Sequence, residues 1–201
     1  MNTPNTFTQQ QLRMATVWLS IPDRWCKPAT SGLLIAAGNK AVLVGPTEVL
    51  GFPLRKRGKE WVAMFMPGLN GRGSVGRAID DSELFAPGTG PARGLTAVVF
   101  NDSDSNLETR ALCLEAAAPR GIFATDLAVP TDQGDDGNTS ATLENALCDT
   151  YIGAPVVVEN DDGIVELLGL TVGPARAVPI AAVLELARAA AALTAPTALP
   201  Q

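Results

Sequence analysis

Short apolar runs separated by turn signals dominate the hydrophobic pattern of this chain. Ala15–Ile21 is followed by Pro22-Asp23 and Leu95–Phe100 by the polar loop Asn101–Asn106, as expected for strands bounded by turns. Ser31–Ala36 and Ala41–Val44 flank Gly38-Asn39-Lys40, which is typical of the turn in a β-hairpin. Three further runs are predicted to be strands: Glu60–Met66, Thr109–Glu115 and Gly121–Val129.

The last third of the chain predicts a second hairpin and one helix. Pro155–Glu159 and Ile164–Val172 enclose the polar turn Asn160–Gly163. From about Pro179 to Leu193 the apolar positions instead follow the spacing of a helix face. Many short strands, one closing helix and no strand-helix-strand rhythm indicate an antiparallel barrel or sandwich.

Charge and hydropathy exclude several classes of function. The chain has 201 residues, of which 46% are hydrophobic, and a formal net charge of −6, so a nucleic-acid partner is not expected. The one basic run, at 55–59, is interpreted as a solvated turn. No stretch reaches the roughly 18 uninterrupted apolar residues that a membrane span needs.

Cysteine and histidine usage narrows the chemistry further. The N-terminus has no secretory signal pattern, and three cysteines without metal-ligand spacing are typical of a reduced, cytoplasmic protein. A periplasmic or secreted protein already trimmed of its leader would look the same. The chain has no histidine, which removes the usual general base of hydrolases and the commonest metal ligand. We therefore expect no metal and no cofactor.

Several segments in a fixed order carry a family resemblance. They are GIFATDLAV (121–129), TYIGAPVVV (150–158), NDDG (160–163), IVELLGLTV (164–172), RAVPI (176–180) and AAVLELA (181–187). This order resembles the trypsin-like serine proteases, nearest to the bacterial HtrA/Deg branch. The segments at 30–51 and 95–100 resemble, more weakly, the parts of that family that carry the catalytic histidine and aspartate.

The resemblance implies an all-β fold: a double antiparallel β-barrel of the trypsin-like type with a C-terminal α-helix. The implied parts are an N-terminal arm (1–12), a first barrel (13–105), a second barrel (106–178), and a helix with its tail (179–201).

The same resemblance places the three catalytic positions on residues that lack the chemistry. The histidine position falls on Thr47, the aspartate position on Leu95 and the serine position on Ile152, while Gly153 and Pro155 of the serine motif are kept. Isoleucine offers no nucleophile and threonine takes no proton at neutral pH. The chain is therefore expected to be a pseudoprotease, not an enzyme, that binds a protein or peptide partner or acts as a scaffold.

Two alternatives stay open: a hydrolase with a relocated nucleophile, and a purely structural subunit, including a homo-oligomer. If the former substrate groove still binds an extended chain by strand addition, the resemblance assigns that role to one strand segment. Its residues are Gly169, Leu170, Thr171, Val172 and Gly173.

Other motifs have weaker support. Gly71–Gly76 matches the dinucleotide-binding string but lacks a helix face after it, so we interpret it as a loop. The residues from Asp102 to Asn106 imitate the start of a calcium loop without its sixth-position glycine, and are interpreted as a solvated loop. Cys148 lacks a base and is interpreted as structural. A serine–lysine dyad would need Lys27, Lys40, Lys56 or Lys59 beside a serine.

Overall fold

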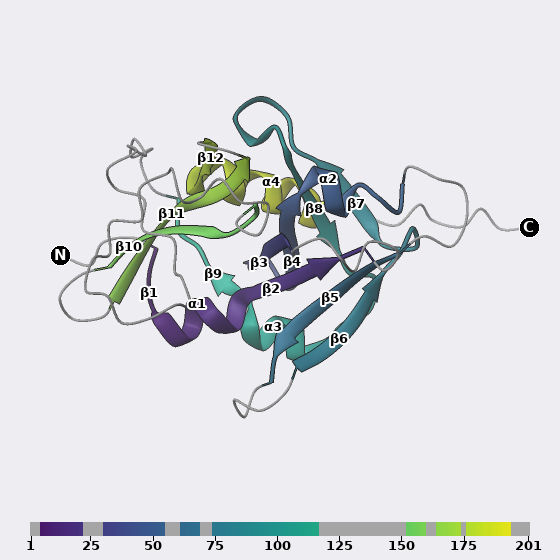
Figure 1. Ribbon diagram of the computed structural model, residues 1–201, viewed down its shortest axis with the longest axis horizontal. Helices are drawn as coiled ribbons and strands as arrows, with labels where there is room; N and C mark the ends of the chain where they lie inside the picture. The colour runs from purple at the N-terminus through teal and green to yellow at the C-terminus, as the bar shows by residue number, and fades with distance from the viewer. Residues whose placement is uncertain are drawn as a thin grey trace, which may run out of the picture.

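The chain folds mainly into β-strands, arranged in two sheets with one long helix packed against both (Figure 1). A computed structural model describes residues 5–21, 30–54, 61–68, 74–116, 152–159, 164–173 and 176–193. In Figure 1 the smaller sheet lies at the left and the larger one extends to the right.

The larger sheet has eight strands in the described part of the chain, ordered β6-β5-β2-β3-β4-β8-β7, with β9 added on β3. All pairs on this path are antiparallel; β9 pairs with β3 in parallel. The strands are β2 (Thr16–Ser20), β3 (Thr30–Ala37), β4 (Lys40–Pro46), β5 (Val62–Pro67), β6 (Ser74–Ile79), β7 (Leu84–Pro87), β8 (Leu95–Val99) and β9 (Leu112–Cys113).

The order of these strands shows why the sheet is curled and barrel-like. Its two end strands, β6 and β7, follow one another in the chain and are separated by residues 80–83 alone. The ends of the path are therefore brought toward each other. The hairpin between β3 and β4 turns at Gly38, whose φ of +64° suits a glycine, as the Gly-Asn-Lys signal predicts.

The smaller sheet contains four strands within the described residues. β11 (Ile164–Gly173) pairs on one side with β10 (Pro155–Glu159), and its other pairings are with β1 (Thr6–Thr8) and β12 (Arg176–Pro179). β1 comes from the predicted N-terminal arm, so the two ends of the chain share this sheet. Asn5 holds the start of β1 in place through two hydrogen bonds. Its side-chain Oδ1 accepts from the Glu115 N–H at 2.8 Å, and its carbonyl accepts from the Leu167 N–H at 3.0 Å.

The helices begin where the sequence supplies the right caps. α1 (Gln9–Ala15) begins after Thr8, which forms a reciprocal capping box with Gln11. α3 (Ser105–Arg110) begins after Asp104, whose side chain accepts from the Asn106 N–H at 2.9 Å. Two short helical segments, α2 (Thr47–Leu50) and the 3-10 turn η2 (Gly90–Ala92), flank the larger sheet, and α4 (Ile180–Ala191) closes the described chain.

Two hydrophobic cores lie on opposite faces of β3, β4 and β8. Leu34, Leu43 and Val98 point into the core enclosed by the curled sheet. The residues next to them in sequence, such as Leu33 and Val44, point into a second core, which β11 and α4 also line. Alternate residues of a strand face opposite sides, so these strands are buried on both faces.

The mostly β, antiparallel architecture with a C-terminal helix is confirmed. The second barrel and the boundary near residue 105 stay predictions, because much of 106–178 lies outside the described residues, including the predicted strand at 121–129. The strand predicted at Thr109–Glu115 is wrong over its first part. There the chain forms α3, because Leu107 and Arg110 occupy one inward face of a helix, and only Leu112–Cys113 is extended.

The interpretation of the glycine string at 71–76 as a loop is wrong for Ser74–Gly76, while residues 71–73 lie outside the described residues. Gly76 lies inside β6, and the segment from Ser74 to Ile79 is a strand. A dinucleotide site would need a helix at that point, so that function is excluded here.

Candidate functional site

Three segments far apart in sequence meet beside Pro46, at the end of β4. Thr47 begins α2 there, and its N–H donates to the Gly94 carbonyl at 2.9 Å. Thr96 of β8 donates from its Oγ1 to the Thr47 Oγ1 at 3.0 Å. Ile152 accepts at its carbonyl from the Ser31 N–H, also at 3.0 Å. We call Thr47, Thr96, Ile152 and Gly153 the junction.

Gly153 holds the third segment close to the other two. Its φ of +84° is a left-handed conformation that favours glycine. A Cβ at this position would overlap the Ser31 carbonyl oxygen and lie 2.7 Å from the Pro46 Cδ. Its N–H donates to the Thr171 carbonyl at 2.8 Å. The backbone around Ile152 is therefore packed directly against the larger sheet and tied to the smaller one.

Of the three predicted positions, Thr47 and Ile152 belong to the junction and Leu95 does not. Thr47 directly follows Pro46, and Pro46 lies beside Gly153, whereas the match of Thr47 and Ile152 to the histidine and serine positions stays a prediction. Leu95 does not face them: it is fully buried and belongs to the core lined by α4. The residue that reaches Thr47 is Thr96, because alternate residues of β8 point to opposite faces.

The side chains at the junction carry no ionisable group. Among the described residues, neither the Thr47 nor the Thr96 hydroxyl is hydrogen-bonded to a carboxylate or an amine. The Thr171 hydroxyl nearby is buried and hydrogen-bonded to Ala154, accepting from its N–H at 3.0 Å. The Thr47 and Thr96 hydroxyls, paired with one another, have no base among the described residues to remove a proton at neutral pH.

Comparison with protein-family models and with curated proteins gives no match to this chain. The trypsin-like resemblance therefore stays a proposal, supported by the geometry of the junction and by the order of the sequence segments.

The strand segment predicted to bind a peptide is not a free edge over most of its length. Gly169, Leu170, Thr171 and Gly173 pair with β12 on one side. On the other side Leu170 pairs with Pro155, and the Thr171 N–H donates to the Ala154 carbonyl at 3.0 Å. The premise of an open edge at Gly169–Thr171 is wrong, because the motif segment 153–155 already pairs there.

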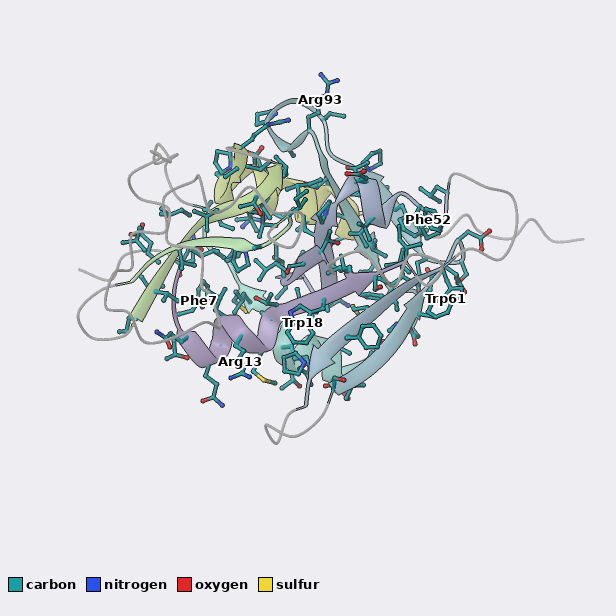
Figure 2. The ribbon with its side chains drawn as sticks, viewed as in Figure 1. Phe7, Arg13, Trp18, Phe52, Trp61 and Arg93 are labelled. Carbon is teal, nitrogen blue, oxygen red and sulfur yellow. The ribbon has the colours of Figure 1, made fainter. Side chains whose placement is uncertain are left out.

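Val172 lies just beyond that pairing. It is partly buried, and it faces the loop before β8, where a Cβ at Gly94 would lie 3.5 Å from it. The same loop carries Arg93 at its outer tip (Figure 2), and the Arg93 carbonyl accepts from Arg176 Nη2 at 2.8 Å. The end of β11 and the loop at 88–94 therefore form one side of the surface next to the junction.

A charged cluster that the sequence did not predict lies at the opposite end of β8 from the junction. Arg77 of β6 forms ion pairs with Glu83 and Asp104, each at 3.1 Å, and with Asp102. Its guanidinium also lies 4.3 Å from the centroid of the Phe100 ring. The expected solvated loop at 102–106 is thus tied to the sheet by its carboxylates. The sequence feature that could have indicated this cluster is a single arginine on a strand, Arg77, with acidic residues in the turns at Glu83 and Asp102.

The electrostatics of the cluster follow from these contacts. Partial burial disfavours the charge of Arg77, but hydrogen bonds to Asp102 and Glu83 outweigh it and raise its pKa. The hydrogen bond from Arg77 in turn lowers the pKa of Asp102. In the described part of the chain, no group of three or more His, Cys, Asp or Glu side chains is arranged to hold a metal ion.

The other predicted groups have separate locations. Lys40 lies at the C-terminal end of α4, where its Nζ donates to the Ala191 and Leu193 carbonyls, and not beside a serine. Cys113 is a free, exposed thiol. Cys148 and the lysines at 27, 56 and 59 lie outside the described residues. None of the helices in the described ranges has both the length and the apolar content to cross a membrane.

Proposed function

We propose that this chain is a catalytically inactive trypsin-like protein that binds a protein or peptide partner, or serves as a scaffold for one. The observation that carries the proposal is the junction, where the segments of Thr47, Thr96 and Ile152 meet and carry threonine and isoleucine side chains. A chain without histidine has no imidazole to complete such a site.

Binding is favoured over a purely structural role by the surface beside the junction. Thr47 is partly exposed at the start of α2, and Val172 and the loop at 88–94 flank it. An extended peptide would lie across Thr47 and continue the pairing of β11 beyond Thr171. The proposed strand-addition site is thus reduced from five residues to the end of β11 at Val172, since Gly173 already pairs with Arg176 of β12.

The binding test compares two neighbouring positions on α2. Peptides would be selected from a random display library with the wild-type protein, and their affinities measured by fluorescence anisotropy. Thr47→Arg places a long side chain across the surface and should weaken binding at least about tenfold, or about 1.4 kcal/mol. Glu48→Arg, which adds a side chain of the same size at the exposed neighbouring position, should leave it unchanged.

Equal loss in both variants would place the binding surface elsewhere. If no peptide is selected and light scattering shows a concentration-dependent assembly, the structural-subunit alternative is favoured. A broad screen with fluorogenic peptides and esters tests the remaining alternative, since a hydrolase with a relocated nucleophile would turn over at least one of these substrates.

A further inference from the structure

Arg110 places a positive charge on the inward face of α3. Its side chain is 3% exposed, and Leu107, three residues earlier on the same face, lies in the core enclosed by the larger sheet. Around it, α3 packs against α1, β3 and β4. An arginine this deeply buried is normally paired with a carboxylate or with several carbonyl groups.

The described residues satisfy only one of the three guanidinium nitrogens. Arg110 Nε donates to the Asn106 Oδ1 at 2.9 Å, whereas Nη1 and Nη2 are buried and hydrogen-bond to none of the described residues. Burial lowers the pKa of Arg110, and the charge of Asp104 opposes that effect. Asp104, however, is engaged elsewhere, because it caps α3 and pairs with Arg77.

We propose that Arg110 is a binding site for an oxyanion that presents two acceptor oxygens, a carboxylate or phosphate group. The two Nη atoms lie side by side in the plane of the guanidinium and match such a group with two parallel hydrogen bonds. Asn106 fixes the Nε side of the plane and so orients the fork. This site is at the α3 end of the molecule and does not depend on the function proposed for the junction.

The test is thermal unfolding of the full-length protein in acetate, phosphate or chloride at constant ionic strength. An oxyanion at a hundredfold excess over its Kd favours the folded state about 100-fold, which raises the Tm of the wild type by about 5–10 °C. Arg110→Met should lose this response. It should also be more stable than the wild type without oxyanion, because an unpaired buried charge is removed. Comparison of the acetate and phosphate arms shows which oxyanion is held.

Arg13→Met is the matched control, since Arg13 is exposed on the outer side of α1 (Figure 2). It should keep the full oxyanion response of the wild type. If the wild type and Arg110→Met gain the same Tm in acetate and in phosphate, the effect is a general one of the salt on the protein surface, and the proposal is wrong.

A second measurement uses the folded wild type alone, in case Arg110→Met does not fold. Buried guanidinium N–H groups give separate ¹⁵N–¹H signals, and Arg110→Lys assigns the signal of Arg110 by its disappearance. Acetate or phosphate should shift that signal to a plateau, while the signals of exposed arginines change little. An Arg110 signal that stays in place through both titrations would overturn the proposal.

Discussion

At the scale of single residues, Gly153 meets two constraints at once. Its positive φ excludes most side chains on conformational grounds, and the approach of Ser31 and Pro46 leaves no room for a Cβ. Gly38 meets only the first constraint, because its φ is +64° and nothing lies within 4 Å of a Cβ there. Substitutions at Gly38 and Gly153 can therefore distinguish the cost of conformational strain alone from the cost of strain combined with steric overlap.

We predict that Gly153→Ala destabilises the fold more than Gly38→Ala. The left-handed conformation alone should lower the free energy of unfolding by about 1–2 kcal/mol at Gly38. Overlap with backbone atoms should bring the loss at Gly153 to about 3 kcal/mol or more. Urea denaturation of both variants measures the difference. Equal losses would mean that the segment at 152–155 moves away from the larger sheet at little cost.

The assignment of Thr47, Leu95 and Ile152 to the catalytic positions stays a prediction, but the sequence defines these positions with different precision. Gly153 and Pro155 tie the serine position firmly, because both have strict backbone requirements. The aspartate position has no such tie, because β8 is buried on both faces and the burial pattern does not distinguish Leu95 from Thr96. A shift of one residue along a strand exchanges its faces, and only the hydrogen bond between Thr96 and Thr47 decides between them.

At the scale of elements, Arg77 joins β6 to the turns before β7 and after β8. It is also the link between the two ends of the curled sheet, because Glu83 lies between β6 and β7. Asp102 has a lowered pKa in the folded state, so its contribution is complete above the ordinary value of 3.8 and is lost as the pH falls below it. The stabilisation by this cluster should therefore disappear in acid.

We predict that Arg77→Met lowers the free energy of unfolding by about 1–2 kcal/mol at pH 7. This is a modest figure because Asp102 is largely exposed, with Phe100 adding a cation–π contribution. The difference between variant and wild type should shrink between pH 4 and pH 2, as urea denaturation at each pH would measure. A difference that is constant over this range would assign the effect to packing on Phe100 and not to the ion pairs.

Lys40 connects the first hairpin to the closing helix. Its Nζ lies 3.2 Å from the Ala191 carbonyl and 3.3 Å from that of Leu193, where the end of a helix attracts positive charge. We predict that Lys40→Met lowers the free energy of unfolding by about 0.3–1 kcal/mol at low salt. The loss of stability in Lys40→Met should be smaller at 1 M salt, and Lys40→Arg, which keeps the charge, should be destabilised less than Lys40→Met. A loss that does not depend on salt would contradict an electrostatic role.

Elements with a local signal were predictable, and those fixed by distant contacts were not. The β3–β4 hairpin and α4 follow from turn residues and from apolar spacing. β1, however, is extended because it pairs with β11, more than 150 residues away in the chain. The end of α3 is predicted as strand because Thr109–Glu115 alternates, whereas the helix is defined by Leu107, outside that run, together with Arg110.

At the scale of the whole molecule, one core connects the two sheets. Residues of β3, β4 and β8 from the larger sheet and of β10, β11 and β12 from the smaller one line it together with α4. The junction lies where these sheets meet, so its backbone is held by both. Substitution of the junction side chains should leave its backbone in place, because the backbone hydrogen bonds of Ser31 and Gly153 do not depend on those side chains.

From this arrangement we predict that Ile152→Ser folds but gains no hydrolytic activity. The chain has no histidine to act as the base for a serine at this position, and the Thr47 and Thr96 hydroxyls of the junction do not remove a proton at neutral pH. Loss of triad function corresponds to about six orders of magnitude in rate, and one restored side chain does not recover it.

Labelling with a fluorophosphonate probe, followed by mass spectrometry of the modified peptide, measures this directly. Wild type and Ile152→Ser should both remain unlabelled, while trypsin in the same tube reacts to completion. Adding Thr47→His and Thr96→Asp to Ile152→Ser tests the geometry itself, because Thr96 and not Leu95 faces Thr47. Labelling of the single variant at the substituted position would mean that a base outside the described residues reaches the junction, and the chain would then be closer to an enzyme than we propose.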